Sequence, residues 1–449
     1  MMYGEVLLAA TMEKVVSLCR RRGFLFQSSE IYGGINACYD YGPMGVELKR
    51  NIRDLWWESM VRARENIVGI DAAILMHPKV WEASGHVEGF TDPLVDCRVC
   101  KMRFREDEID PEKRKDGRCP HCGNKNALTD ARQFNLMFKT HMGPVEESAS
   151  IIYLRPETAQ GIYVNYKNVL DSSRLKIPFG IAQIGKAFRN EITPGNFIFR
   201  TREFEQMEMQ FFVKPGTDAE AFEYWKEQRM KWYFQLGINR EKLRLHEHGS
   251  EELAHYARAA FDIEYEFPMG WKELEGVHNR TDFDLSRHQE FSGKDLTYFD
   301  DSTRERFVPY IIETSAGVDR TVLTCLIDGY EEEKLEKETR TVLHLNPKIA
   351  PVKAAVFPLV NRDGMPEIAR KIADDLMRRF NVFFDASGAV GRRYRRQDEI
   401  GTPFCITIDS QTLEDDTVTI RNRDTMIQDR AGIRNLLQII GDRIRTESE

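Results

Sequence analysis

The spacing of apolar and polar residues predicts both helices and strands in the first 346 residues of the chain. Helical spacing is found at 12–64, with a glycine-rich turn inside it, and at 218–236, where aromatic residues recur as on a core-facing helix. Strand-like runs are found at 178–213, 261–267 and 310–313. The residues before 12 are also expected to be helical. The charged run 331–340 is expected to be a solvated helix face or a loop.

A second pattern begins beyond a proline-flanked boundary at 346–351. Strand-like runs there alternate with helical ones, and the last 20 residues have helical spacing. This alternation predicts a separate mixed α/β domain at 351–449. Its string GRRYRRQ mixes tyrosine with Arg392, Arg393, Arg395 and Arg396, which suits phosphate contact and stacking on an unpaired base. The alternative interpretation is a solvated helix face.

Composition indicates a globular protein. A chain of 449 residues is long enough for two or three domains with their own cores. It has no run of about 18 apolar residues, and no basic segment precedes its short apolar N-terminal stretch. We therefore expect no membrane association and a cytoplasmic location. The net charge of −8 argues against a surface that is basic overall, but a local track for nucleic acid needs only a few residues.

Four of the eight cysteines form two pairs in a polar, turn-rich insert at 92–130. Cys97, Cys100, Cys119 and Cys122 have the spacing C-x2-C-x18-C-x2-C, which can present four thiolates to one tetrahedral Zn²⁺. Such a zinc would be structural, because four thiolates leave no open coordination position. The alternative is four reduced thiols in an insert without its metal. The other, scattered cysteines fit a reducing compartment.

Two runs carry side chains that suggest a nucleotide site. Residues 188–212 read as strand, loop and strand, and alternation puts five residues on one face of the second strand: Arg202, Phe204, Gln206, Glu208 and Gln210. A cation, an aromatic ring, amides and a carboxylate suit a phosphate, a base and a small ammonium group. By itself, the run could equally be a charged surface hairpin.

The second run, PYIIETSAGVDR at 309–320, reads as a buried strand, a small-residue turn at 315–317 and a helix. The first turn of that helix carries Arg320, which could bind a phosphate in a forked geometry. Together the two runs resemble motifs 2 and 3 of the class II aminoacyl-tRNA synthetases. Residues 69–81, which follow a helical segment at 44–64, resemble motif 1, the dimer-forming motif of that class.

Four further strings are similar to those of the homodimeric glycyl-tRNA synthetases: SEIYGGINACYDYGPMGVELK, ASGHVEGFTDP, LRPETAQGIYVNY and WKELEGVHNRTDFDLSRH. The resemblance covers nearly the whole chain and implies an α+β fold. Residues 1–346 would be a class II catalytic domain, an antiparallel sheet with flanking helices. It would carry a zinc-ribbon-like insert at 92–130 and an insertion at 214–265 between motifs 2 and 3. Residues 351–449 would be a mixed α/β anticodon-binding domain.

The resemblance also implies the site residues. Arg189, Glu191 and Arg320 would be catalytic, and Glu273 is the candidate Mg²⁺ ligand. ATP would be bound by Arg189, Asn190, Glu191, Phe199, Arg200, Thr201, Arg202, Glu203, Phe204, Glu273, Leu274, Gly317, Val318, Asp319 and Arg320. Glycine would be bound by Arg105, Glu157, Phe204, Glu205, Gln206, Met207, Glu208, Glu313, Thr314, Ser315, Ala316 and Gly317. Thr314 departs from the family, in which proline is common at this position.

The implied reaction joins the carboxylate of glycine to the α-phosphate of ATP and then passes glycine from the adenylate to tRNA(Gly). Cations and Mg²⁺ must neutralise two anions that meet, and no covalent enzyme intermediate is required. A carboxylate cage selects an ammonium by charge, and steric walls must exclude larger amino acids, because one methylene is worth only about 1–3 kcal/mol. The alternatives are a non-catalytic, zinc-dependent RNA-binding relative and a synthetase for serine, threonine or proline.

Overall fold

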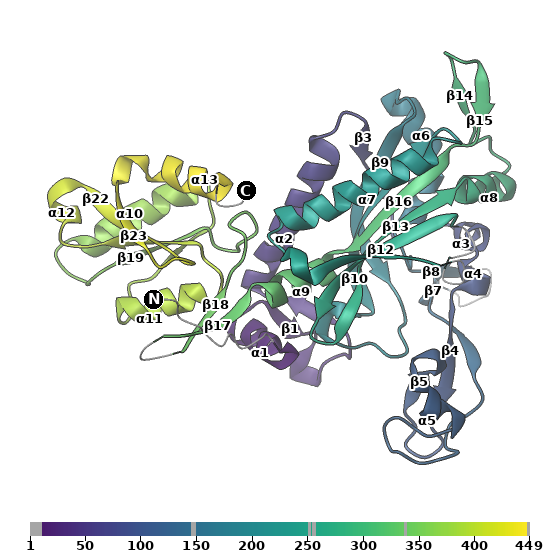
Figure 1. Ribbon diagram of the computed structural model, residues 1–449, viewed down its shortest axis with the longest axis horizontal. Coiled ribbons are helices and arrows are strands. Elements are labelled where there is room, and N and C mark those ends of the chain that lie inside the picture. The colour runs from purple at the N-terminus through teal and green to yellow at the C-terminus, as the bar shows by residue number, and fades with distance from the viewer. Residues whose placement is uncertain (1–10, 145–149, 250–252, 254–256, 336–338, 447–449) are drawn as a thin grey trace.

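The computed structural model describes residues 11–144, 150–249, 253, 257–335 and 339–446. These residues form two units with separate sheets and cores, and a small cysteine-bearing lobe that projects from the larger unit (Figure 1). In this part of the chain, no helix is long and apolar enough to cross a lipid bilayer.

The larger unit is built on a seven-stranded sheet in the order β11-β12-β13-β16-β10-β9-β3. All neighbours are antiparallel except β3 and β9. The strands are β3 (Ile67–Gly69), β9 (Phe179–Phe188), β10 (Glu203–Val213), β11 (Leu243–Glu247), β12 (Ala259–Phe267), β13 (Gly270–Thr281) and β16 (Tyr310–Gly317). Ser315 of β16 lies opposite Glu208 of β10 on one side and Gly276 of β13 on the other. Residues far apart in sequence therefore share one stretch of sheet.

Helices cover both faces of this sheet. On one face, apolar residues of four helices pack against Met207, Met209 and Phe211 of β10. These helices are α1 (Met12–Arg22), α2 (Pro43–Trp57), α7 (Asp218–Gln235) and α9 (Val318–Asp328). On the other face, α6 (Ala159–Ser173) and α8 (Phe283–Ser292) pack against Phe179 and Phe212. The predicted helix at 218–236 is confirmed, and its Trp225 and Trp232 are buried in the core.

The N-terminal segment of the larger unit is mainly helical, as predicted, but a hairpin separates its two helices. Strands β1 (Leu25–Gln27) and β2 (Tyr39–Tyr41) pair between α1 and α2. Gly45 lets α2 approach this hairpin, because a Cβ there would lie 1.9 Å from the carbonyl oxygen of Phe24. The expected helix before residue 12 lies outside the described residues at 1–10, and α1 begins at Met12.

The projecting lobe is the cysteine-bearing insert. Its sheet has the order β5-β4-β6, made of β4 (Thr91–Asp96), β5 (Arg103–Arg105) and β6 (Arg132–Asn135), with a short helix α5 (Pro111–Lys115). Its small core is built around the cysteines. Two short helices, α3 (Pro78–Ala83) and α4 (His86–Gly89), lead into it, and the hairpin of β7 (Lys139–His141) and β8 (Ile151–Tyr153) follows it. A further hairpin, β14 (Tyr298–Asp300) with β15 (Glu305–Phe307), precedes β16.

The smaller, C-terminal unit has a five-stranded mixed sheet in the order β20-β19-β21-β22-β23. β19 is parallel to β20 and β21, and the other pairs are antiparallel. The strands are β19 (Ala354–Pro358), β20 (Val382–Phe384), β21 (Phe404–Ile408), β22 (Thr417–Asn422) and β23 (Gln428–Gly432). The helices are α10 (Met365–Met377), α11 (Val390–Asp398), α12 (Thr412–Asp415) and α13 (Leu436–Thr446). The predicted alternation of strands and helices is present, and β23 and α12 are additions. The helix expected over the last 20 residues begins only at Leu436, because residues up to Gly432 pair as β23.

Two local expectations are wrong. The expected turn at 315–317 is strand, because β16 pairs with β10 as far as Gly317 and α9 begins at the next residue. The described residues of the charged run, 331–335 and 339–340, are mostly strand, and none of them is helical. The run contributes to a hairpin of β17 (Tyr330–Lys334) and β18 (Thr339–Leu343), because alternate residues such as Arg340 and Val342 are buried against neighbouring structure.

Candidate active site

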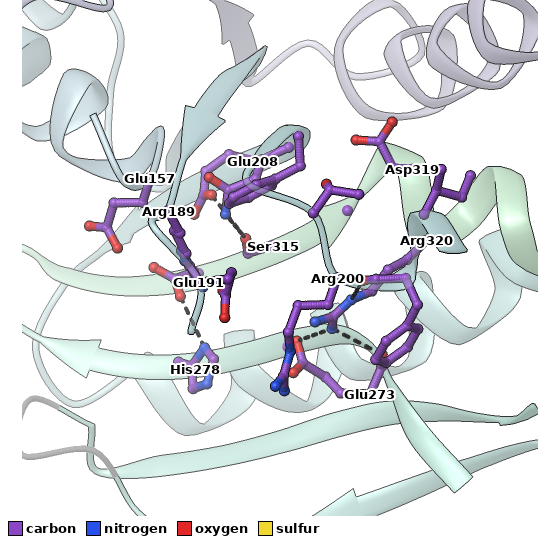
Figure 2. A pocket seen from close by; sticks show the side chains of 18 of the residues that line it. Glu157, Arg189, Glu191, Arg200, Glu208, Glu273, His278, Ser315, Asp319 and Arg320 are labelled. Carbon is purple, nitrogen blue, oxygen red and sulfur yellow. Dashed lines mark hydrogen bonds and ion pairs between the residues drawn. The ribbon is translucent and has the colours of Figure 1, made fainter. Parts of the chain in front are cut away.

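A cavity lined by many charged side chains lies over β10, β13 and β16 (Figure 2). Its volume is about 940 Å³, including space open to solvent. Carboxylates gather around one end, and arginines and aromatic rings around the other. The lining residues are Glu157, Arg189, Glu191, Ile198, Phe199, Arg200, Thr201, Phe204, Gln206, Glu208, Glu273, Gly276, His278, Arg280, Glu313, Ser315, Gly317, Asp319 and Arg320.

Glu208 is the central carboxylate of the acidic end. Its Oε2 accepts hydrogen bonds from Ser315 Oγ at 2.9 Å and Thr158 Oγ1 at 3.1 Å, and its Oε1 accepts one from Gln210 Nε2 at 2.8 Å. No cationic side chain of the described residues lies within ion-pair distance of it. Burial and the nearby charge of Glu313 raise the pKa of Glu208 well above its usual value. A bound cation would lower the pKa of Glu208 again by stabilising its ionised form.

The two other carboxylates at this end already have cationic or ionisable partners. Glu313 accepts from Arg280 Nη1 at 2.9 Å and lies 3.0 Å from His278 Nδ1. Burial opposes ionisation, but these partners lower the pKa of Glu313 to about 2. Glu157 lies 3.3 Å from His86 Nε2, and despite its burial this imidazole and Arg280 hold the pKa of Glu157 far below the usual range. Glu313 and Glu157 are therefore ionised, and Arg280 offsets part of their negative charge.

At the other end, arginines lie against aromatic rings. The guanidinium of Arg189 is 5.2 Å from the ring of Phe204 and 5.3 Å from that of Phe90, and its Nε donates to the carbonyl oxygen of Pro156. The guanidinium of Arg320 is 4.5 Å from the ring of Phe199. Flat cations over rings form surfaces on which a planar base and a phosphate chain can both bind.

Two acidic residues stand among these arginines. Glu273 Oε1 is 3.2 Å from Arg320 Nη1, and this charge is the main reason that the pKa of Glu273 is lowered (Figure 2). Glu191 is different, because its buried Oε2 has no hydrogen-bond partner in the described part of the chain. Burial accordingly raises the pKa of Glu191. An unpaired acceptor facing a cavity is suited to a ligand that brings a donor.

Comparison with known proteins places this geometry in a family. Residues 109–330 match the model of the tRNA synthetase class II core domain (G, H, P, S and T), and residues 353–443 match that of the anticodon binding domain. The glycine–tRNA ligase of Treponema denticola is 61% identical over 443 residues, with 97% of each chain covered. That of Borreliella burgdorferi is 58% identical over 98% of each chain. That of Thermobifida fusca is 55% identical over 96% of this chain and 98% of its own.

This chain belongs to the glycine–tRNA ligase family. The predicted fold class is confirmed with it: a class II synthetase core on an antiparallel sheet, a four-cysteine insert, and a C-terminal mixed α/β anticodon-binding domain.

Ten residues expected at the site do not line the cavity. Because successive side chains of a strand point to opposite faces, Glu205, Met207, Thr314 and Ala316 face away from it. Glu205 instead forms ion pairs with Lys49 at 2.7 Å and Arg53 at 3.2 Å. Leu274 and Val318 are buried in the apolar core. The others also have their side chains outside the cavity lining: Arg105, Asn190, Arg202 and Glu203.

Arg105 was expected to close over the substrate, but in this structure it forms ion pairs within the insert. Its guanidinium lies 3.0 Å from Asp92 and 2.7 Å from Asp107. Beside it, Glu108 forms an ion pair at 2.5 Å with Arg200, which does line the cavity. The insert therefore reaches the arginine-rich end through Glu108.

Four lining residues were not predicted from the sequence: Ile198, Gly276, His278 and Arg280. Three of them occur at alternate positions of β13, so they share the face that points into the cavity. Alternation in the string GVHNR could have predicted that these three residues share a face. Only the pairing of β13 with β16 shows that this face points into the cavity.

The four cysteines of the insert lie together as predicted. All four sulfur atoms are within 4.8 Å of one another, with Cys97 Sγ 3.7 Å from Cys122 Sγ and Cys100 Sγ 3.6 Å from Cys119 Sγ. Thiolates on one tetrahedral ion with bonds of about 2.3 Å would be about 3.8 Å apart. The cluster therefore has the donor set and the size of a metal site.

The basic helix α11 presents only some of its arginines. Arg392 is exposed, and Arg395 and Arg396 are partly exposed and paired with Asp398 at 3.3 Å and Asp385 at 2.8 Å. Arg393 is 2% exposed, and its Nη1 donates to the carbonyl oxygens of Pro358 and Asp385. The expectation that Arg393 binds tRNA thus conflicts with its burial, because both Nη atoms donate to backbone carbonyl oxygens inside the fold.

Proposed function

We propose that the chain attaches glycine to tRNA(Gly) in two steps through a glycyl-adenylate. One observation carries this proposal: a single cavity joins a carboxylate cage around Glu208 to a set of ring-stacked arginines, Arg189 and Arg320. The cage suits the ammonium of an amino acid, and the arginines suit a nucleoside triphosphate. Family membership supports the same activity.

In the first step, a glycine carboxylate oxygen bonds to the α-phosphorus of ATP and pyrophosphate leaves. Arg189 is suited to hold both anions, because it lines the same cavity as the carboxylate cage and its aromatic neighbours fix its plane. Phe204 would stack on the adenine, Glu191 would accept a hydrogen bond from it, and Arg200 and Arg320 would neutralise the phosphate chain. Mg²⁺, which prefers carboxylate and phosphate oxygens, would be held by Glu273 and would supply further charge neutralisation.

In the second step, a ribose hydroxyl at the tRNA 3′ end attacks the carbonyl carbon and AMP leaves. During both steps Glu208 would hold the ammonium, with its carboxylate oriented by Ser315, Thr158 and Gln210. These fixed contacts keep the cage close to the α-carbon. Glycine selection would follow from this crowding, since a longer side chain would have to displace hydrogen-bonded groups.

Three further assignments belong to the proposal. The four cysteines would hold one structural Zn²⁺, which would order the insert. The exposed face of α11 at Arg392 and its neighbours would contact tRNA. The α2–β3 segment, which contributes the edge strand of the large sheet, would form the dimer with a second copy of the chain. Sedimentation of the purified chain tests this last point.

Pyrophosphate exchange with a panel of amino acids tests the function. Glycine should drive exchange of pyrophosphate into ATP, and serine, threonine, proline and alanine should not. Exchange driven by another amino acid would point to a synthetase of different specificity. Tight RNA binding without exchange would point to a non-catalytic relative. The Glu305→Gln variant, altered at an exposed residue of the β14–β15 hairpin, should behave as the unaltered chain.

A further inference from the structure

The hairpin that joins the two units carries a second cluster of metal-ligand side chains, far from the cysteines in sequence. Glu331 and Glu333 occupy alternate positions of β17, and His344 directly follows β18. One ligand atom from each lies within 4.8 Å of the other two. Their shared face is the one that packs against the C-terminal unit, where Arg340 of the same hairpin pairs with Asp398 at 2.9 Å.

The distances around His344 fit a shared ion better than hydrogen bonds. Its Nε2 is 3.3 Å from Glu331 Oε2 and 3.5 Å from Glu333 Oε1. This nitrogen is buried, and among the described residues it has no hydrogen-bond partner. Ligand atoms held at about 2.0–2.1 Å by a tetrahedral Zn²⁺ are about 3.3–3.4 Å apart. The two nitrogen-to-oxygen distances are therefore close to those between ligands of one ion, and all three ligand atoms lie within 4.8 Å of one another.

Neighbouring side chains orient His344 and Glu333 so that His344 Nε2 and Glu333 Oε1 are free to bind a metal ion. Asp424, from the loop after β22, lies 2.6 Å from His344 Nδ1. This contact holds the imidazole proton on Nδ1 and leaves a lone pair on Nε2, an arrangement typical of metal-binding histidines. Arg340 Nη1 donates to Glu333 Oε2 at 2.7 Å, which leaves Oε1 for an ion. Asp424 is itself fixed by Arg423 at 2.7 Å and 2.8 Å.

We propose that Glu331, Glu333 and His344 form a second metal site, which takes Zn²⁺ or a similar divalent transition-metal ion. One nitrogen and two carboxylate oxygens are a common three-ligand set for zinc, with water in the fourth position. The ligands belong to the hairpin and the orienting Asp424 belongs to the C-terminal unit. Metal binding thus favours the docked arrangement of the two units, in the same way that any ligand stabilises the state that binds it.

The rival interpretation is an ion-pair network in which a protonated His344 sits among three carboxylates. It needs no metal, and zinc would then leave the hairpin unchanged. The two interpretations differ in the number of metal ions that the chain binds, so counting them decides between the two.

The test uses the full chain, dialysed against buffered Zn²⁺, with zinc per chain measured by mass spectrometry. We expect about two ions in the unaltered chain and about one in His344→Gln. Glu331→Gln, which keeps the contact between His344 and Asp424, should also lose one ion and covers the case in which the histidine variant fails to fold. His77→Gln, altered at an exposed histidine, should retain two. Equal zinc content in the unaltered chain and both ligand variants would overturn the proposal.

Hydrogen exchange supplies a second readout. At a free zinc concentration ten times the dissociation constant, exchange that requires undocking of the β22–β23 turn should slow about tenfold. His344→Gln should abolish this effect. The Cys97→Ser/Cys119→Ser variant should keep it, because the cysteine cluster lies in a separate lobe. Loss of the effect in the cysteine variant, with His344→Gln unaffected, would assign it to the insert and contradict the second site.

Discussion

Glu208 and Glu313 lie on adjacent antiparallel strands, and one amide joins them. Gln210 Nε2 donates to Glu208 Oε1 at 2.8 Å and to Glu313 Oε2 at 3.0 Å. Their surroundings shift the two pKa values in opposite directions. Arg280 and His278 lower the pKa of Glu313, whereas burial and the negative charge of Glu313 raise the pKa of Glu208. In the ligand-free protein Glu208 is thus the carboxyl that lacks a cation, and an ammonium group would supply one.

Replacing Glu208 with Gln should impair glycine activation far more than ATP binding. Loss of one preorganised charge typically costs about 10²–10³ in rate. In the unaltered chain, kcat/KM for glycine should rise with pH through the raised pKa of Glu208, because only the ionised form attracts the ammonium. Pyrophosphate-exchange kinetics against pH measure both effects. An unchanged KM for glycine in Glu208→Gln would contradict the cage.

The same substitution should stabilise the ligand-free protein at neutral pH. The folded state binds a proton at Glu208 more readily than the unfolded state, so this residue's contribution to the free energy of unfolding falls as pH rises from about 4.5 through the raised pKa. Glutamine does not titrate and escapes this loss. Thermal unfolding should show a higher Tm for Glu208→Gln at pH 8, and the difference should shrink toward pH 5. A constant difference across that range would show that titration of Glu208 is not its cause.

Arg189→Ala should lower the rate of adenylate formation by about 10²–10³ while leaving the fold intact. Arg189→Lys should recover only part of this loss, because a lysine keeps the charge but cannot fill the flat space between Phe90 and Phe204. Single-turnover adenylate formation measures the effect, with Lys186→Ala, altered at a partly exposed lysine, as the control. Near-normal rates in Arg189→Ala would remove this residue from the mechanism.

Cys97→Ser or Cys119→Ser should lose about one zinc per chain and loosen the insert without unfolding the chain. The insert's small core is made around the cysteines, whereas the main core is independent of them. Metal analysis and proteolysis between 97 and 130 measure the two effects. Cys38→Ser, at a cysteine outside the cluster, should change neither. Full zinc retention in both cluster variants would show that these thiolates do not hold the metal.

Arg392→Ala and Arg393→Ala should have different effects, although the residues are adjacent. Arg392 is exposed, so its loss should weaken tRNA binding and reduce the slope of log affinity against log salt by about one. Arg393 is buried, and its loss leaves the carbonyls of Pro358 and Asp385 unpaired at a cost of about 1–3 kcal/mol. Filter binding at several salt concentrations and denaturant unfolding separate the two. Equal salt slopes in both variants would contradict the assignment.

Alternation within β10 determined from the sequence alone that Phe204, Gln206 and Glu208 share a face, and all three line the cavity. The cysteine spacing likewise determined the four-sulfur cluster, because each knuckle is a local structure whose geometry depends on a few residues. The helices and most strands of the C-terminal unit followed from periodicity for the same reason.

The tertiary structure decided which of these faces meet. Periodicity gives the direction of a side chain relative to its own strand, but only the order β13-β16-β10 brings His278 and Arg280 to Glu313. It also decided that residues 315–317 are strand and that Arg393 is buried, since both depend on neighbours supplied by distant segments. The approach of Asp424 to His344 is of the same kind: 80 residues separate them, and only the docking of the two units makes them neighbours.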